Sequence, residues 1–148
     1  MPRGGTLLAI HDERERSRGV NPRVLIVDDD EDLLDTLRRL LERFGYTCLT
    51  AASGAAAIAV LDALSPDLVV TDLHMPGTDG LAVARRARQA VPPIPVVVIT
   101  AYPTRRMEQE LQAVGGAIHL SKPFANADMV DAVRRALGSR DSGALTTR

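Results

Sequence analysis

This chain of 148 residues has little cysteine, few aromatic side chains and no long apolar run. Its single cysteine, Cys48, excludes an internal disulfide and a zinc site built from several cysteines. No apolar run approaches the roughly 18 residues that a transmembrane helix needs. The apolar patch at residues 6–10 is too short for the core of a signal peptide. These absences predict a cytoplasmic protein without a membrane span.

An excess of one charge is also missing, because 18 Lys and Arg residues stand against 19 Asp and Glu residues, a net charge of −1. Without a global basic field, direct nucleic-acid binding is not expected. Arg85, Arg86 and Arg88 form only a small basic face. The apolar share of 45% and the charged share of 25% are typical of one globular domain.

Three regions can be distinguished along the chain. Residues 1–21 show no sustained hydrophobic periodicity and predict a flexible N-terminal extension. Residues 22–138 are regular and predict one domain. Gly138 follows the last apolar stripe, and residues 139–148 are mostly small and polar, so we expect a disordered C-terminal tail there.

The regular region repeats one unit five times: a short, β-branched apolar run followed by an amphipathic stretch. The predicted strands are 24–27, 46–50, 68–71, 96–99 and 117–120. The strands lack polar alternation, which is typical of strands covered on both faces. Alternating strands and helices predict an α/β fold with a parallel sheet. We expect a flavodoxin-like, doubly wound, five-stranded sheet of order 2-1-3-4-5 with five helices.

Polar residues stand where these strands end. Asp28 and Asp29 follow the first strand, Asp72 the third and Thr100 the fourth, and Lys122 comes shortly after the fifth. The carboxyl ends of parallel strands share one edge of the sheet, so these groups should converge. Three converging carboxylates repel one another unless a cation joins them, and Mg²⁺ suits such oxygen ligands. A cation, an ammonium, a hydroxyl and a free carboxylate together suit phosphoryl transfer to an aspartate.

Four segments at these strand ends resemble the receiver domain of two-component response regulators. They are residues 24–31 (VLIVDDDE), 68–80 (LVVTDLHMPGTDG), 99–102 (ITAY) and 121–124 (SKPF), and the resemblance spans about residues 22–138. It implies a phosphorylation-activated signalling switch. It does not imply an enzyme, since a receiver only assists its own phosphorylation and dephosphorylation.

The resemblance also implies the chemistry of the pocket. Asp72 matches the phosphoryl acceptor. Asp28 and Asp29 match the acidic pair that holds Mg²⁺, with Asp29 the direct ligand and Asp28 acting through water. The backbone carbonyl of His74 matches the position that completes the metal coordination. The family uses the side chain at this position to tune dephosphorylation.

The same resemblance implies the switch. Thr100 matches the hydroxyl that turns toward the phosphoryl oxygens, and Lys122 matches the ammonium that pairs with them. The bond from Lys122 to Pro123 is often cis in the family. His119 stands where the family usually carries Tyr or Phe, so it is a switch candidate that would add pH sensitivity. Tyr102 is expected near the site, where it would limit access of water.

The resemblance implies that the partners are a sensor histidine kinase or a histidine phosphotransfer protein, together with a downstream protein. The downstream protein should bind the face formed by helix 107–114, strand 117–120 and helix 126–137, and a homodimer could form there. Only 11 residues follow Leu137, which leaves no room for an output domain. We therefore expect a stand-alone receiver or a fragment of a larger regulator.

Three alternatives remain open. A phosphohydrolase with an aspartate nucleophile would need a carboxylate two residues after Asp72, where His74 stands; turnover of a phosphomonoester would support it. A receiver-like scaffold independent of phosphate would leave Asp72 unmodified by acetyl phosphate. A flavodoxin-type cofactor binder is disfavoured because the acidic first loop would repel a flavin phosphate.

Overall fold

The computed structural model describes residues 21–145, with side chains through Gly138. Its strands are β1 (Arg23–Val27), β2 (Thr47–Ala51), β3 (Leu68–Asp72), β4 (Val96–Thr100) and β5 (Ala117–Ser121). Its helices are α2 (Glu31–Arg43), α3 (Gly54–Leu64), α4 (Gly80–Arg88), α5 (Arg105–Val114) and α6 (Asn126–Leu145). The strands form one parallel sheet of order β2-β1-β3-β4-β5. The predicted fold class and strand order are therefore confirmed.

Hydrophobic strands hold the centre of the sheet. Every residue of β3 and β4 is buried, as expected for strands covered on both faces. The register pairs Val27 with Thr71 and Asp72 with Ile99. The carboxyl ends of β1, β3 and β4 are therefore level with one another, and the residues at these ends share one edge of the sheet.

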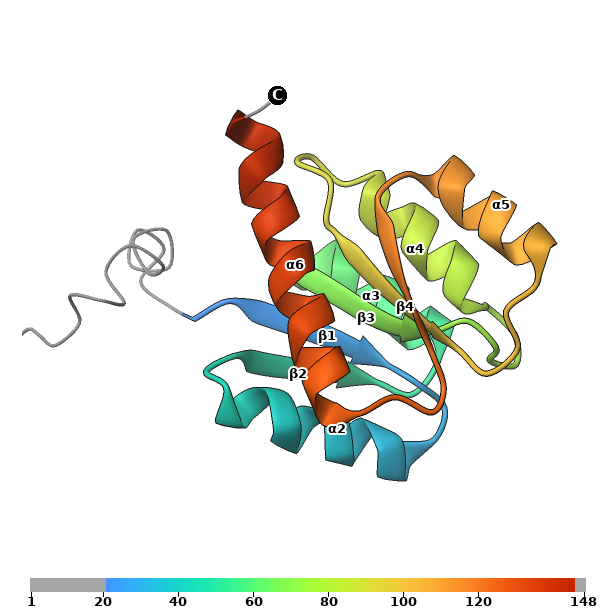
Figure 1. Cartoon of the computed structure of the whole chain (residues 1–148), viewed down its shortest axis with the longest axis horizontal. Coiled ribbons are helices and arrows are strands. Elements are labelled where there is room, and N and C mark those ends of the chain that lie inside the picture. The colour runs from blue at the N-terminus through green and yellow to red at the C-terminus, as the bar shows by residue number, and fades with distance from the viewer. Residues whose placement is uncertain (1–20, 146–148) are drawn as a thin grey trace, which may run out of the picture.

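The helices cover both faces of the sheet, with α2 and α6 on one side and α3, α4 and α5 on the other (Figure 1). Leu37, Leu41 and Met129 pack under the first pair, whereas Ala57 and Val83 pack under the second group. Four helices begin at a side chain that accepts a backbone N–H of the first turn. These N-caps are Asp30, Ser53, Asp79 and Thr104.

The last helix is longer than its sequence pattern predicts. Helix α6 continues to Leu145, so the expected disordered tail is wrong for residues 139–145, and residues 146–148 lie outside the described part. Gly138 was expected to end the helix, but a glycine does so by taking a positive φ, and Gly138 is not among the residues that do. The terminal turns extend past the sheet in Figure 1.

Two further predictions concern the N-terminal extension and membrane-spanning helices. The proposed N-terminal extension at residues 1–21 lies, apart from Asn21, outside the described residues. Among the described residues, no helix is both long enough and apolar enough to cross a bilayer.

Candidate functional site

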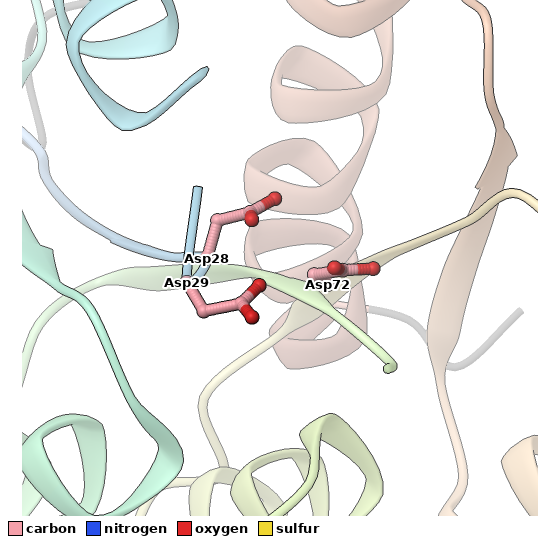
Figure 2. Close-up of side chains that lie close together, drawn as sticks. All are labelled: Asp28, Asp29 and Asp72. Atoms are coloured by element: carbon pink, nitrogen blue, oxygen red, sulfur yellow. The ribbon is translucent and has the colours of Figure 1, made fainter. Parts of the chain in front are cut away.

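Three carboxylates meet at the carboxyl edge of the sheet. Asp28 and Asp29 follow β1, and Asp72 is the last residue of β3. One oxygen from each carboxylate lies within 4.8 Å of the others, and Figure 2 shows the three side chains close together. Asp28 and Asp72 are buried, whereas Asp29 is exposed. The pocket therefore has a buried floor and one open side.

A lysine that follows the outermost strand, β5, reaches this cluster along the same edge of the sheet. Lys122 follows β5, and its Nζ lies 3.8 Å from Oδ2 of Asp28 and 3.7 Å from Oδ2 of Asp72. Its backbone N–H donates to the carbonyl of Thr100 at 2.8 Å. Its peptide bond to Pro123 is cis. One ammonium thus bridges two buried carboxylates.

Burial and neighbouring charges act in opposite directions on the ionisation of the Asp28 carboxyl group. Its pKa is raised above the ordinary value, first because burial disfavours the charged form, and also because Asp72 and Asp29 repel it. The Asp30 N–H, which donates to Oδ1 at 2.9 Å, and the charge of Lys122 oppose this rise. The buried Oδ2 has no hydrogen-bond donor in the described chain. Three carboxylates against one lysine, with an oxygen left unsatisfied, fit a hard divalent cation.

Thr100 lies one strand away from the acceptor candidate. It ends β4, is fully buried, and follows Ile99, the residue that pairs with Asp72. Its Oγ1 accepts the backbone N–H of Tyr102 at 3.1 Å. The hydroxyl is therefore held by the β4–α5 loop, and its rotation would break a contact to that loop.

His74 and Tyr102 flank the acidic cluster. The His74 N–H donates to Oδ1 of Asp72 at 3.5 Å, which is at the long limit of a hydrogen bond. The rings of His74 and Tyr102 meet edge to face, with centroids 6.5 Å apart, and Tyr102 is 75% exposed. Tyr102, the side chain expected to limit access of water, thus contacts the ring of His74, whose backbone N–H lies beside Asp72.

His119 is not brought into the acidic cluster. It lies in edge strand β5 opposite Val98 and is half-buried. Its buried Nε2 has no hydrogen-bond partner within the described residues. The structure places His119 on the strand that leads to Lys122, so any influence on the pocket would pass along that strand.

Gly80 supports the site and was missed in the sequence. A Cβ on Gly80 would lie 2.0 Å from the carbonyl oxygen of Asp72, a distance that no side chain tolerates. Its N–H also donates to the carbonyl of Leu73 at 3.1 Å. The first turn of α4 therefore sits directly against the acceptor strand. The only signal in the sequence was a glycine at a helix start, after the capping Asp79.

The fold and this pocket define an α/β protein with a cluster of three carboxylates, able to hold a cation, beside a lysine and a threonine. The sequence matches the response regulator receiver domain over residues 24–134. It is 34% identical to sporulation initiation phosphotransferase F of Bacillus subtilis strain 168, over 80% of this chain and 95% of that protein. It is 35% identical to the DNA-binding transcriptional regulator NtrC of Escherichia coli K12, over 77% of this chain but only 24% of that protein.

Solved structures agree with this relationship. The Vibrio cholerae chemotaxis protein CheY4 superposes with a TM-score of 0.74 at 27% identity, covering 79% of this chain and 99% of its own. The signal receiver domain of an HD domain-containing protein from Pseudomonas fluorescens Pf-5 gives 0.76 at 29% identity, covering 82% and 98%.

The chain belongs to the receiver domain family of two-component response regulators. Receiver domains are signalling switches that bind Mg²⁺ at an acidic pocket and interact with histidine kinases or phosphotransfer proteins and with downstream effectors. The chain corresponds to nearly the whole of one relative and to about a quarter of another.

Proposed function

We propose that Asp72 accepts a phosphoryl group from a histidine kinase or a histidine phosphotransfer protein. A carboxylate oxygen of Asp72 forms a bond to phosphorus as the bond from phosphorus to the donor nitrogen breaks, which leaves an aspartyl phosphate. The observation that carries this proposal is the convergence of Asp72, Asp28 and Lys122 within 3.8 Å contacts at one sheet edge. Phosphoryl transfer depends on such alignment and charge neutralisation more than on covalent assistance.

Asp28, Asp29, Asp72 and the backbone carbonyl of His74 are the groups that would hold Mg²⁺ in this pocket. The bound cation would neutralise charge on the phosphoryl oxygens and on the crowded carboxylates. Burial of Asp28 and its unsatisfied Oδ2 support this assignment. The exposed Asp29 leaves one side of the pocket open for the phosphoryl donor.

Lys122 and Thr100 would respond to the new phosphoryl group. Its charge of about −1.5 to −2 and its acceptor oxygens attract the Lys122 ammonium, now shared between Asp28 and Asp72. They also offer an acceptor to the Thr100 O–H, and rotation of this hydroxyl toward them would release the Tyr102 N–H that Thr100 Oγ1 now accepts. Because that N–H belongs to the loop that leads into α5, phosphorylation would shift the equilibrium of the face formed by α5, β5 and α6.

This face is the proposed docking surface for the downstream protein. We place the reaction in the cytoplasm, where ATP supplies histidine kinases. We assign no turnover of a separate substrate, because the position two residues after Asp72, where a phosphohydrolase would carry a carboxylate, is His74. His119, half-buried on β5, is the proposed side chain that changes environment with the switch.

Intact mass after treatment with acetyl phosphate and Mg²⁺ tests this proposal. The wild-type chain should gain the mass of one phosphoryl group, and Asp72→Ala should gain none. Asp131→Ala removes an exposed carboxylate on α6 and should behave like wild type. An unmodified wild-type chain would instead favour a phosphate-independent scaffold. Multiple turnover of a phosphomonoester would favour a phosphohydrolase.

A further inference from the structure

A second polar pocket lies far from the acidic cluster. It opens between the C-terminal ends of α4 and α5, with a volume of about 300 Å³, and is lined by Arg85, Arg88, Gln89, Ala113 and Val114. In a sheet whose strands all run parallel, each connecting helix runs back in the opposite direction. Its C-terminal end therefore lies at the edge of the sheet where the strands begin. The pocket therefore lies toward the edge opposite the one that carries Asp72.

Arg88 lines this pocket, and its buried Nε–H donor has no acceptor in the described chain. Its Nε is buried and has no hydrogen-bond partner within residues 21–138. Its guanidinium lies against the backbone at Gly116, where an added Cβ would be 3.1 Å from Nη2 and 3.2 Å from Cζ. A buried donor that lacks an acceptor is costly. The arrangement therefore calls for an acceptor that comes from outside the described chain.

The charge of the pocket favours an anion as that acceptor. Arg85 and Arg88 are three residues apart on α4, which places both on one side of the helix, and both line the pocket. No carboxylate lines it. Within the described part of the chain the neighbouring Arg86 pairs with Asp62, whereas neither Arg85 nor Arg88 has an ion pair. Two full positive charges outweigh the roughly half negative charge at each helix C-terminus.

We propose that this pocket binds a dianionic oxyanion, either inorganic phosphate or the phosphate group of a small monoester. Guanidinium groups match phosphate oxygens in a bidentate fork, and two of them balance the charge of one phosphate dianion. The Gln89 amide offers a further donor. Ala113 and Val114 form an apolar wall that would contact the organic part of a monoester.

Amide chemical shifts of residues 85–89 and 113–116 test this site in metal-free buffer. Inorganic phosphate and phenyl phosphate are titrated separately, with sodium chloride at matched ionic strength as the reference. We expect saturable shifts with phosphate or phenyl phosphate and none with chloride. Tighter binding of phenyl phosphate would identify a monoester site, and equal binding would identify a site for the phosphate group alone.

Three variants locate the site. Arg88→Gln and Arg85→Gln should each weaken phosphate binding about tenfold or more, because each removes a charge-assisted contact. Arg86→Gln removes a guanidinium of the same helix that does not line the pocket, and it should bind as the wild type does. The proposal is wrong if the shifts match those in chloride, or if folded Arg85→Gln and Arg88→Gln both bind as tightly as the wild type.

Discussion

Asp28→Asn should stabilise the metal-free protein at neutral pH, although it removes an ion pair. Taking an effective dielectric of about 20, the attraction of Lys122 at 3.8 Å is about 4 kcal/mol. The repulsion from Asp72, whose oxygen lies within 4.8 Å, is at least about 3.5 kcal/mol. Exposed Asp29 adds a weaker, screened repulsion. The charges around Asp28 therefore nearly cancel, and the cost of burying its own charge remains.

The cost of burying the Asp28 charge decides whether Asp28→Asn raises or lowers the free energy of unfolding. Asp28 is 1% exposed, and desolvation of a buried ion costs several kcal/mol. The hydrogen bond from the Asp30 N–H returns about 1.5–3 kcal/mol, and the carbonyl of an asparagine can still accept it. We expect Asp28→Asn to raise the free energy of unfolding by about 1–3 kcal/mol at pH 7.

The gain in stability from Asp28→Asn should depend on pH. The pKa of Asp28 is raised above the ordinary value of 3.8, so the native state binds more protons than the unfolded state between 3.8 and the raised pKa. The contribution of Asp28 to wild-type stability is complete below pH 3.8 and is lost as pH rises through the raised pKa. The advantage of Asp28→Asn is therefore absent below pH 3.8 and reaches its full size above the raised pKa.

Urea denaturation in EDTA at several pH values measures this effect. Asp131→Asn, at an exposed position paired with Arg135, is the control and should change stability by no more than about 0.5 kcal/mol. Adding Mg²⁺ should stabilise the wild type more than Asp28→Asn. A loss of stability in the metal-free variant at pH 7, or a gain that persists unchanged below pH 3.8, would refute this reasoning.

Three further predictions concern other parts of the domain. Gly80→Ala should lower the free energy of unfolding by about 3 kcal/mol or more in urea denaturation, because its Cβ would lie 2.0 Å from the Asp72 carbonyl oxygen. Gly77→Ala is the control: Gly77 has φ +77 and open space around it, so this variant should lose only about 1–2 kcal/mol. Burial raises the pKa of the Cys48 thiol to about 11, so iodoacetamide at pH 8 should alkylate it about a hundredfold more slowly in the native than in the unfolded chain; equal rates would contradict this. Leu41→Ala, at a fully buried position on α2, should lower stability by about 2–5 kcal/mol in thermal unfolding.

Much of this architecture follows from local pattern. The apolar runs that became β3 and β4 are buried on both faces, so their lack of polar alternation was a direct consequence of their environment. The placement of Asp72 and Thr100 at strand ends was predictable to within one residue. Each is in fact the last residue of its strand, because the ladder continues one step past the apolar run. The largest boundary error was the end of the last helix, since a glycine without positive φ does not stop a helix.

The sequence by itself determined the order of strands and helices, and it identified Asp28, Asp29, Asp72, Thr100 and Lys122 as the residues at the carboxyl edge. The tertiary structure decided how these residues meet. Lys122 bridges Asp28 and Asp72 only because β5 and β1 are held on either side of β3 and β4. The steric demand at Gly80 and the unpartnered Arg88 also became visible only there. Periodicity reports which side of an element is buried, whereas a contact between distant segments depends on how whole elements pack.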